Sequence, residues 1–137
     1  MGFKVDFSEV EKYIQSLKLT QNDFNKFLSS FLVEMADRVL EKTIPKTPVK
    51  TGTLKRSWKL GELKGSGKEI SIEIKNPMEY ATEIEYGHVI KRNNVEIGWY
   101  EGRFMLKSSI DEIKRQLPLR YEEKFARFCM ERGLNVN

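Results

Sequence analysis

Cysteine and histidine are almost missing from this sequence of 137 residues, in which Cys129 and His88 are the only examples. Because a disulfide takes two cysteines and a structural zinc ion takes four thiolate or imidazole ligands, one chain can build neither. Cys129 lies with Phe125 and Phe128 in an apolar stripe at helical spacing, which predicts a buried, inert thiol. A Cys/His nucleophile pair is the alternative for these two side chains.

Long apolar runs are missing as well. No stretch approaches the roughly 18 apolar residues that a membrane-spanning helix needs, and the first residues carry neither the apolar core of a secretory signal nor a myristoylation pattern. We therefore expect a protein of the reducing cytosol with no membrane partner. Basic residues exceed acidic ones by only 24 to 20, so the net charge of +4 says little about partners.

The apolar content is nevertheless sufficient for a folded domain. Hydrophobic residues make up 39% of the chain and charged residues 32%, which excludes disorder. A chain of this length buries roughly two thirds of its unfolded surface, which is enough for one core without cross-links. We expect a single domain over residues 1–137.

Apolar residues recur at helical spacing in the N-terminal third of the chain. A capping-box pattern predicts a first helix over 8–17. A second, longer helix is expected from Thr20 to about residues 42–44, because Pro45 disfavours helical geometry in the residue before it. Two prolines and a glycine follow without any period, so a flexible or projecting loop is predicted over 45–56.

Apolar residues alternate with polar ones over 57–63 and 69–75, which predicts a β-hairpin. The apolar segment 80–90 is ambiguous between helix and strand. A further hairpin is expected around 91–94, followed by a long C-terminal helix with a kink or break at Pro118. This order predicts an α+β fold, with N-terminal helices and a long C-terminal helix packed on an antiparallel sheet of about four strands.

Paired carboxylates are the main candidates for catalysis. In a strand, Glu83 and Glu85 would point to the same face, with His88 close by, as a small hydrolase site needs. Glu79 with Glu83 is a second pairing. Charges solvated on a strand face are the commoner explanation of such a pattern. The glycines of the first hairpin precede no helix, so no phosphate-binding loop is predicted. We expect no enzymatic activity, no cofactor and no metal.

Basic residues gather in one part of the chain. Between residues 38 and 68 there are nine basic residues and two acidic ones, and the basic ones are Arg38, Lys42, Lys46, Lys50, Lys55, Arg56, Lys59, Lys64 and Lys68. Such a stretch can neutralise phosphates without reading sequence, which makes a small nucleic-acid-binding module using the 38–68 region an alternative function. Lysines that keep a loop solvated explain the pattern equally well.

Three blocks of the sequence resemble a known family. They are TPVKTGTLKRS at 47–57, NPMEYATEIEYGH at 76–88 and GRFMLKSS at 102–109. In this order they are similar to the TPxxTGxLRxS, YAxxxEYG and pFlxpA blocks of the gene-ten-like tail-component family of tailed bacteriophages and prophages. The sequence departs from the family pattern at His88, where threonine is usual, and at Lys107 and Ser109, where proline and alanine are usual.

The resemblance implies a structural, non-enzymatic protein of the virion neck or upper tail, which acts in head-to-tail joining or tail completion as a ring-forming subunit. The implied partners are further copies of itself, in a ring of sixfold or twelvefold symmetry, and the phage connector, head-completion and tail-tube proteins. Such a protein is located in the virion and is assembled in the cytoplasm of the host bacterium. A small α+β domain with an exposed strand edge can join copies by sheet extension in a closed ring.

The resemblance also selects residues. The candidates for the family motif and for interfaces are Thr47, Pro48, Thr51, Gly52, Leu54, Ser57, Tyr80, Ala81, Glu85, Tyr86, Gly87 and Phe104. If the basic loop lines the lumen of a ring, Lys50, Lys55 and Arg56 would contact passing DNA. That contact would be weak and nonspecific, because tight binding would obstruct ejection of the DNA.

Overall fold

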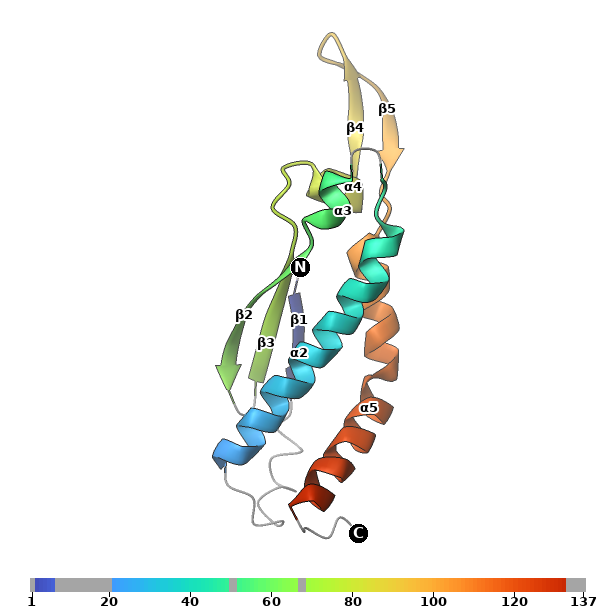
Figure 1. Ribbon diagram of the computed structural model, residues 1–137. Coiled ribbons are helices and arrows are strands. Elements are labelled where there is room, and N and C mark those ends of the chain that lie inside the picture. Colours follow the sequence, from blue (N-terminus) through green and yellow to red (C-terminus); the bar gives the residue numbers. More distant parts are fainter. Residues whose placement is uncertain (1, 7–20, 50–51, 67–68, 133–137) are drawn as a thin grey trace.

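The computed structural model describes residues 2–6, 21–49, 52–66 and 69–132. Helices and strands follow one another in the order β1 (Gly2–Asp6), α2 (Gln21–Lys46), α3 (Thr53–Arg56), β2 (Lys59–Ser66), β3 (Glu69–Lys75), α4 (Ala81–Tyr86), β4 (Gly87–Arg92), β5 (Val95–Glu101) and α5 (Met105–Glu131) (Figure 1). The predicted α+β class is confirmed. The predicted helix over 8–17 lies outside the described residues.

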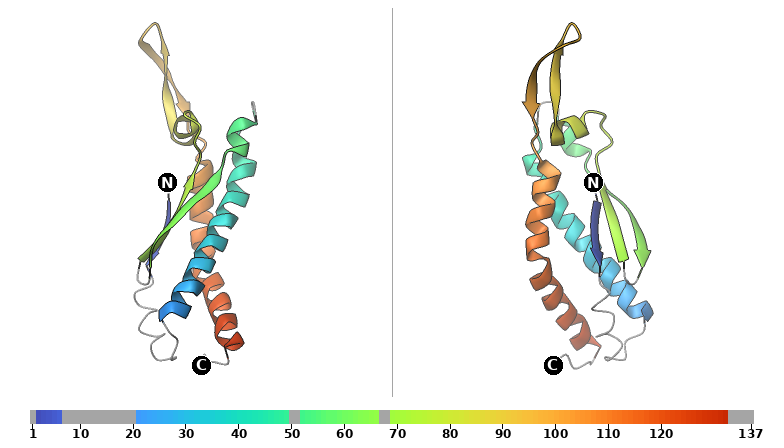
Figure 2. Two further views of the ribbon diagram at one scale, coloured as in Figure 1. Left: turned by 60° about the vertical axis from the view of Figure 1, so that its left-hand side comes forward. Right: turned by 180° about the vertical axis from the view of Figure 1, so that it is seen from behind.

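The strands form two separate antiparallel sheets rather than one. β3 lies between β1 and β2 in a three-stranded sheet, while β4 and β5 form a two-stranded hairpin. The long helices α2 and α5 lie side by side over one face of the three-stranded sheet (Figure 2). The hairpin extends beyond this body at the end opposite to the C-terminus of α5 (Figures 1 and 2).

The main core lies between the three-stranded sheet and the two long helices. The predicted alternation along β3 is confirmed, because Ile70, Ile72 and Ile74 are buried while the residues at either end of the strand are exposed. The helices cover these residues with the buried side chains Phe24, Leu28, Phe31, Leu32, Met35, Ala36, Val39, Leu106, Ile110, Ile113, Phe125 and Cys129. Each fully buried large apolar side chain stabilises the fold by roughly 1.5–3 kcal/mol.

Cys129 belongs to this core, as the apolar stripe predicted. Its side chain is buried, and burial raises the pKa of the thiol. Because the thiolate is the reactive form, this position disfavours a role as a nucleophile. The predicted burial of Cys129 in the core is confirmed.

Two prolines lie inside helices that were expected to end or break there. α2 continues through Pro45 to Lys46, past the predicted end at 42–44. A proline in the last turn removes only its own N–H bond, and the N–H of Thr47 closes the helix on the carbonyl of Ile44 at 3.1 Å. α5 likewise continues through Pro118 without a break.

The predicted loop over 45–56 is shorter in the structure. Residues 45–46 belong to α2 and residues 53–56 form the single turn α3, with Leu54 buried beneath it. Gly52 precedes α3 with φ of 76°, a left-handed conformation that favours glycine. The segment therefore turns the chain from α2 into β2 through a short helix.

Candidate functional site

The three sequence blocks meet in a second, smaller apolar cluster at the end of the body that carries the hairpin. Leu54 from the first block, Ala81 from the second and Met105 from the third are buried against one another. Trp58 and Ile84 are among the partly buried side chains that surround them. We call the region built by the three blocks the junction, because it connects α3, α4 and the start of α5 below the hairpin.

The first block is held by a buried threonine. Thr47 is 2% exposed, and its hydroxyl donates to the carbonyl of Thr43 at 2.9 Å. The same hydroxyl oxygen accepts a hydrogen bond from the indole N–H of Trp58, also at 2.9 Å. Ser57 donates its hydroxyl to the carbonyl of Thr53 at 2.6 Å and closes the turn of α3. Thr47 therefore fixes the end of α2 to the start of β2.

Asn76 joins the first block to the second. Its side-chain amide donates to the carbonyl of Leu54 at 2.8 Å, and its amide oxygen accepts the backbone N–H of Met78 at 3.1 Å. The sequence places Asn76 at the start of the second block, but this role was not predicted. The signal was available, because asparagine commonly bonds the backbone two residues on and has a second group free for another contact.

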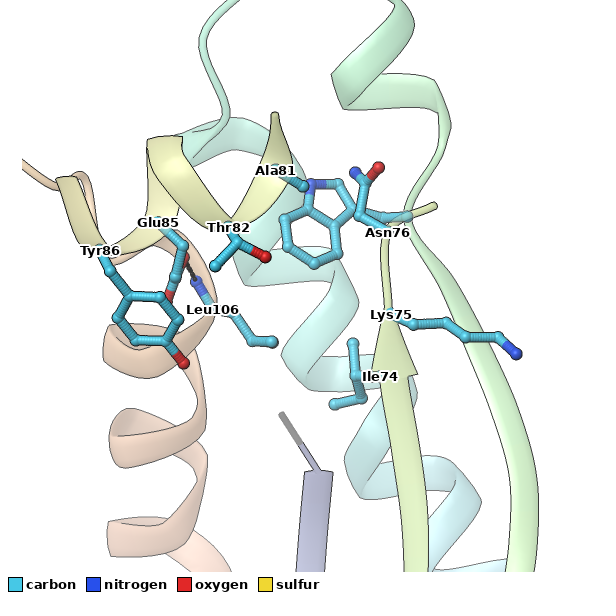
Figure 3. Close-up of a pocket in the computed structure, with 9 residues that line it drawn as sticks. Ile74, Lys75, Asn76, Ala81, Thr82, Glu85, Tyr86 and Leu106 are labelled. Carbon is cyan, nitrogen blue, oxygen red and sulfur yellow. Dashed lines mark hydrogen bonds between the residues drawn. The ribbon is translucent and has the colours of Figure 1, made fainter. Parts of the chain in front are cut away.

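Glu85 joins the second block to the third. Glu85 is 4% exposed, and its carboxylate accepts the backbone N–H of Leu106 at 2.9 Å (Figure 3). The carboxylate also accepts the backbone N–H of Lys107 at 2.8 Å. These N–H groups lie in the first turn of α5, where no carbonyl of the helix can reach them. A negative charge also interacts favourably with the helix dipole there. Glu85 acts as the N-terminal cap of α5 in place of Phe104, whose side chain makes no capping bond.

The hydrolase hypothesis required residues that the structure separates. Segment 81–86 is helical, so Glu83 and Glu85 do not share a face as they would in a strand. Glu83 is exposed, as is Glu79, and both carboxylate oxygens of Glu85 are occupied by α5. His88 stacks on Tyr100 with ring centroids 5.2 Å apart. The strand-face pairing of Glu83 with Glu85 that the hydrolase alternative needs is therefore not formed.

Gly87 and Gly102 allow the two backbone segments at the base of the hairpin to lie in close contact. A Cβ atom on Gly102 would lie 2.6 Å from the carbonyl oxygen of Glu85, and one on Gly87 would lie 2.6 Å from the carbonyl oxygen of Tyr100. The N–H groups of Arg103 and Phe104 then donate to the carbonyls of Ile84 and Glu85 at 2.8 and 3.0 Å. The segment that enters the hairpin and the segment that leaves it are therefore hydrogen-bonded to each other at the junction.

A cavity of about 140 Å³ lies beside these residues, lined by Ile74, Lys75, Asn76 and Thr82 among others (Figure 3). Ligand sites usually measure about 300–1,000 Å³. Within the described residues, no group of three or more His, Cys, Asp or Glu side chains is placed to hold a metal ion. No helix in the same part of the chain has the length and apolarity to cross a membrane.

The interface candidates divide into buried and exposed residues. Tyr80, Tyr86 and Phe104 are 40–45% exposed, and the rings of Tyr86 and Phe104 meet edge to face at 6.3 Å. Gly87 begins β4, and Pro48 is partly buried. Thr51 lies outside the described residues. The buried motif residues hold the junction together, whereas these aromatic rings are available for contacts with partners.

The described basic residues of 38–68 lie on three elements, α2, α3 and β2. Within the described residues, Arg38 pairs with Glu34 at 3.4 Å, and both Lys42 and Lys46 pair with Glu112 at 3.5 Å. Removal from water raises the pKa of Glu112, but the two lysines outweigh this and lower its pKa overall. The other basic residues are spread over α3 and β2, with Arg56, Lys59 and Lys64 exposed and Lys55 partly buried, while Lys50 and Lys68 are not described.

The hairpin is the most exposed part of the protein. Every residue of β5 and the last four residues of β4 are exposed. The exposed side chains include the large apolar residues Val89, Ile90, Val95, Ile97, Trp99 and Tyr100. Sequence reasoning predicted a hairpin here but placed its strands in the main sheet, because alternating apolar residues usually face the protein's own core.

Together these features define a small α+β protein with an apolar hairpin, and the motif residues build the base of that hairpin. Residues 8–87 match the model of the family described as bacteriophage HK97-gp10, putative tail-component. The match covers more than half of the chain, and the chain belongs to this family of phage tail components. The third block, at 102–109, lies beyond the matched range. No curated protein and no solved structure gives a significant match.

Proposed function

We propose that this phage tail component acts in the neck or upper tail of the virion, as a ring-forming structural subunit that joins the head to the tail or completes the tail. The observation that supports this proposal is the hairpin, which extends from the junction and presents six large apolar side chains to solvent. Contiguous exposed apolar surface of this kind marks contact sites for other proteins. The partners proposed are further copies of the chain and the connector, head-completion and tail-tube proteins, met in the host cytoplasm during assembly.

A non-enzymatic role is consistent with the chemistry of the junction. Glu85, the one buried carboxylate among the described residues, uses both oxygens to cap α5. Thr47 and Asn76 likewise use their polar groups on neighbouring backbone and side chains. The residues that the family pattern selects therefore stabilise an arrangement of elements.

Deletion of the gene from the phage or prophage that carries it tests this function. Particles produced without the protein should accumulate as filled heads and separate tails in electron micrographs, and a plasmid copy should restore joined virions. Joined, infectious virions in the absence of the gene would refute the proposal. A complete loss of tails would also contradict it, because that result places the protein at an earlier step of tail assembly.

We also propose that any contact with DNA is weak and nonspecific and is made by basic residues near α3. Lys55 and Arg56 have no acidic partner in the described part of the chain, in contrast to the lysines of α2. Duplex binding should therefore be measurable only at low salt, and Lys55→Gln with Arg56→Gln should lower the slope of log affinity against log salt by about two. Tight binding at physiological salt would favour the nucleic-acid-binding module instead.

A further inference from the structure

Both edges of the hairpin are open. Among the described residues, β4 pairs only with β5, and β5 pairs only with β4. A two-stranded hairpin is marginally stable by itself in water, and unpaired strand edges are ready templates for further strands. The hairpin can therefore accept one additional strand beside β4 and another beside β5.

The hairpin is apolar on both faces, which favours pairing at its edges over docking of one face. The register pairs His88 with Tyr100 and Val89 with Trp99, so that these two pairs lie on opposite faces. Trp99 on one face is 53% exposed, and Tyr100 on the other face is 41% exposed. A partner laid on one face would leave the other face in water. A strand added at an edge packs side chains against the hairpin on both faces at once.

The two edges carry opposite charges. β4 contains Lys91 and Arg92 and no acidic residue, whereas β5 contains Glu96 and Glu101 and no basic residue. Joining β4 to β4, or β5 to β5, would bring like charges together across the new ladder, which is destabilising. Joining β5 of one copy to β4 of the next places acidic residues beside basic ones. The best partner for each edge is therefore the opposite edge of a second copy of this chain.

The strand directions allow this contact to repeat. β4 and β5 are antiparallel, so a rotation about an axis parallel to the hairpin places β5 of one copy antiparallel to β4 of the next. Each copy then uses two different edges, and such head-to-tail contacts close into rings. Six copies would give a barrel of about twelve strands, and barrels of more than about eight strands leave an interior channel.

The junction holds the hairpin of every copy in the same orientation before the hairpins pair. Gly87 and Gly102 hold the two ends of the hairpin in contact with the backbone of α4, and the Glu85 carboxylate fixes the start of α5 beside them. A hairpin held in this way loses little conformational freedom when it pairs, which favours assembly.

We propose that the β4–β5 hairpins of neighbouring copies pair edge to edge, β5 of one copy with β4 of the next, and that this contact closes the ring. The inference rests on the proposed ring function and names the surface that forms it. It makes the hairpin the oligomerisation element of the chain, while the exposed aromatic rings of the junction remain for other partners.

Charge reversal at single edges tests the pairing. In one variant, Glu96→Lys with Glu101→Lys makes both edges basic; in the other, Lys91→Glu with Arg92→Glu makes both edges acidic. Each variant alone should require at least a tenfold higher concentration to assemble in analytical ultracentrifugation. An equimolar mixture should assemble at a lower concentration than either variant alone, because basic and acidic edges then alternate around the ring, while the like-charge pair at positions 91 and 96 within each hairpin is the same in the mixture as in the single variants. Glu62→Lys with Glu73→Lys, at exposed positions of the three-stranded sheet, is the matched control and should assemble normally.

Cross-linking locates the contact. Lys91→Cys in one tagged chain is mixed with Val95→Cys, Glu96→Cys or Ile97→Cys in an untagged chain, all with Cys129→Ser, and the mixtures are oxidised. At least one mixture should give tagged–untagged disulfide dimers at ten times the yield of Lys64→Cys mixed with Glu73→Cys. The three positions on β5 allow the register between the two copies to differ by one residue in either direction. Circular dichroism verifies that each variant remains folded.

The outcomes separate this inference from the proposed function. Assembly that the charge reversals leave unchanged, or that gives no hairpin cross-link, would refute edge pairing while leaving a ring in the neck intact. An unmodified chain that stays monomeric at every concentration, and also with the neighbouring neck proteins, would refute the ring contact. Joined virions without the gene would refute the neck function itself.

Discussion

The carboxylate of Glu85 in α4 accepts the backbone N–H of Leu106 in α5 at 2.9 Å, across the base of the hairpin. This bond connects two segments of the chain that the hairpin separates. It makes the glutamate of the EYG block a structural residue with a specific task. Its loss should therefore change stability and the fixed geometry of the hairpin.

Glu85→Ala should lower the free energy of unfolding by about 2 kcal/mol, because two N–H groups in the first turn of α5 lose their acceptor in a buried place. Glu85→Gln keeps one acceptor oxygen and should lose less. Urea denaturation followed by circular dichroism measures both. The matched control is Glu83→Ala in the same short helix, where the side chain is exposed and the change should stay within about 0.5 kcal/mol. Equal losses for the two alanine variants would contradict the capping role.

Gly102→Ala should destabilise the protein by roughly 1–3 kcal/mol, because the new Cβ atom would meet backbone that cannot move aside as a side chain can. The carbonyl oxygen of Glu85 lies 2.6 Å from that Cβ position, and the N atom of Gly87 lies 2.9 Å away. Thermal unfolding measures the effect. Gly98→Ala in β5 is the control, since its nearest neighbour is Ile90 Cδ1 at 3.8 Å. A loss at Gly98 as large as that at Gly102 would show that the close crossing is not the cause.

The sequence predicts the main body well because its signals are local. Alternation along 69–75 places Ile72 in the core, and helical spacing over α2 and α5 places Leu28 and Ile110 there. β1 was not predicted, although Phe3 and Val5 alternate with polar residues, because five residues at a terminus give little periodic signal.

The candidate site was harder to predict for two physical reasons. The segment around Glu85 is only six residues long as a helix, too short for its period to differ clearly from that of a strand. Alternation in Val95, Ile97 and Trp99 shows that the segment is a strand but does not show which surface covers it. The resemblance to the family selected Thr47 and Glu85, but only the structure shows that they act as buried connectors.

The ion pairs of Glu112 predict a dependence of stability on pH. Removal from water raises the pKa of this carboxyl, but Lys42 and Lys46 outweigh that effect and hold the pKa below its usual range. A carboxyl whose pKa is lower in the folded state stabilises the fold above its unfolded pKa, and this contribution disappears as pH falls through the folded pKa. Glu112→Gln should therefore lower the melting temperature slightly at pH 7 and not at pH 2, and added salt should reduce the difference. A difference that persists at pH 2 would mean that packing, not charge, is responsible.

Thr47→Val tests the first block. The substitution keeps the shape of the side chain but removes the hydroxyl that donates to Thr43 and accepts from the Trp58 indole. The partly buried indole N–H then has no acceptor in the protein, so the free energy of unfolding should fall by about 1–3 kcal/mol. With Trp99→Phe in the background, Trp58 fluorescence reports the junction alone, and its emission should shift as the indole loses its fixed partner. Thr82→Val is the control, because Thr82 is exposed on α4. If both valine variants unfold at the same urea concentration with unchanged emission, the hydroxyl of Thr47 does not hold α2 to β2, and the apolar contacts of Leu54, Ala81 and Met105 alone must support the junction.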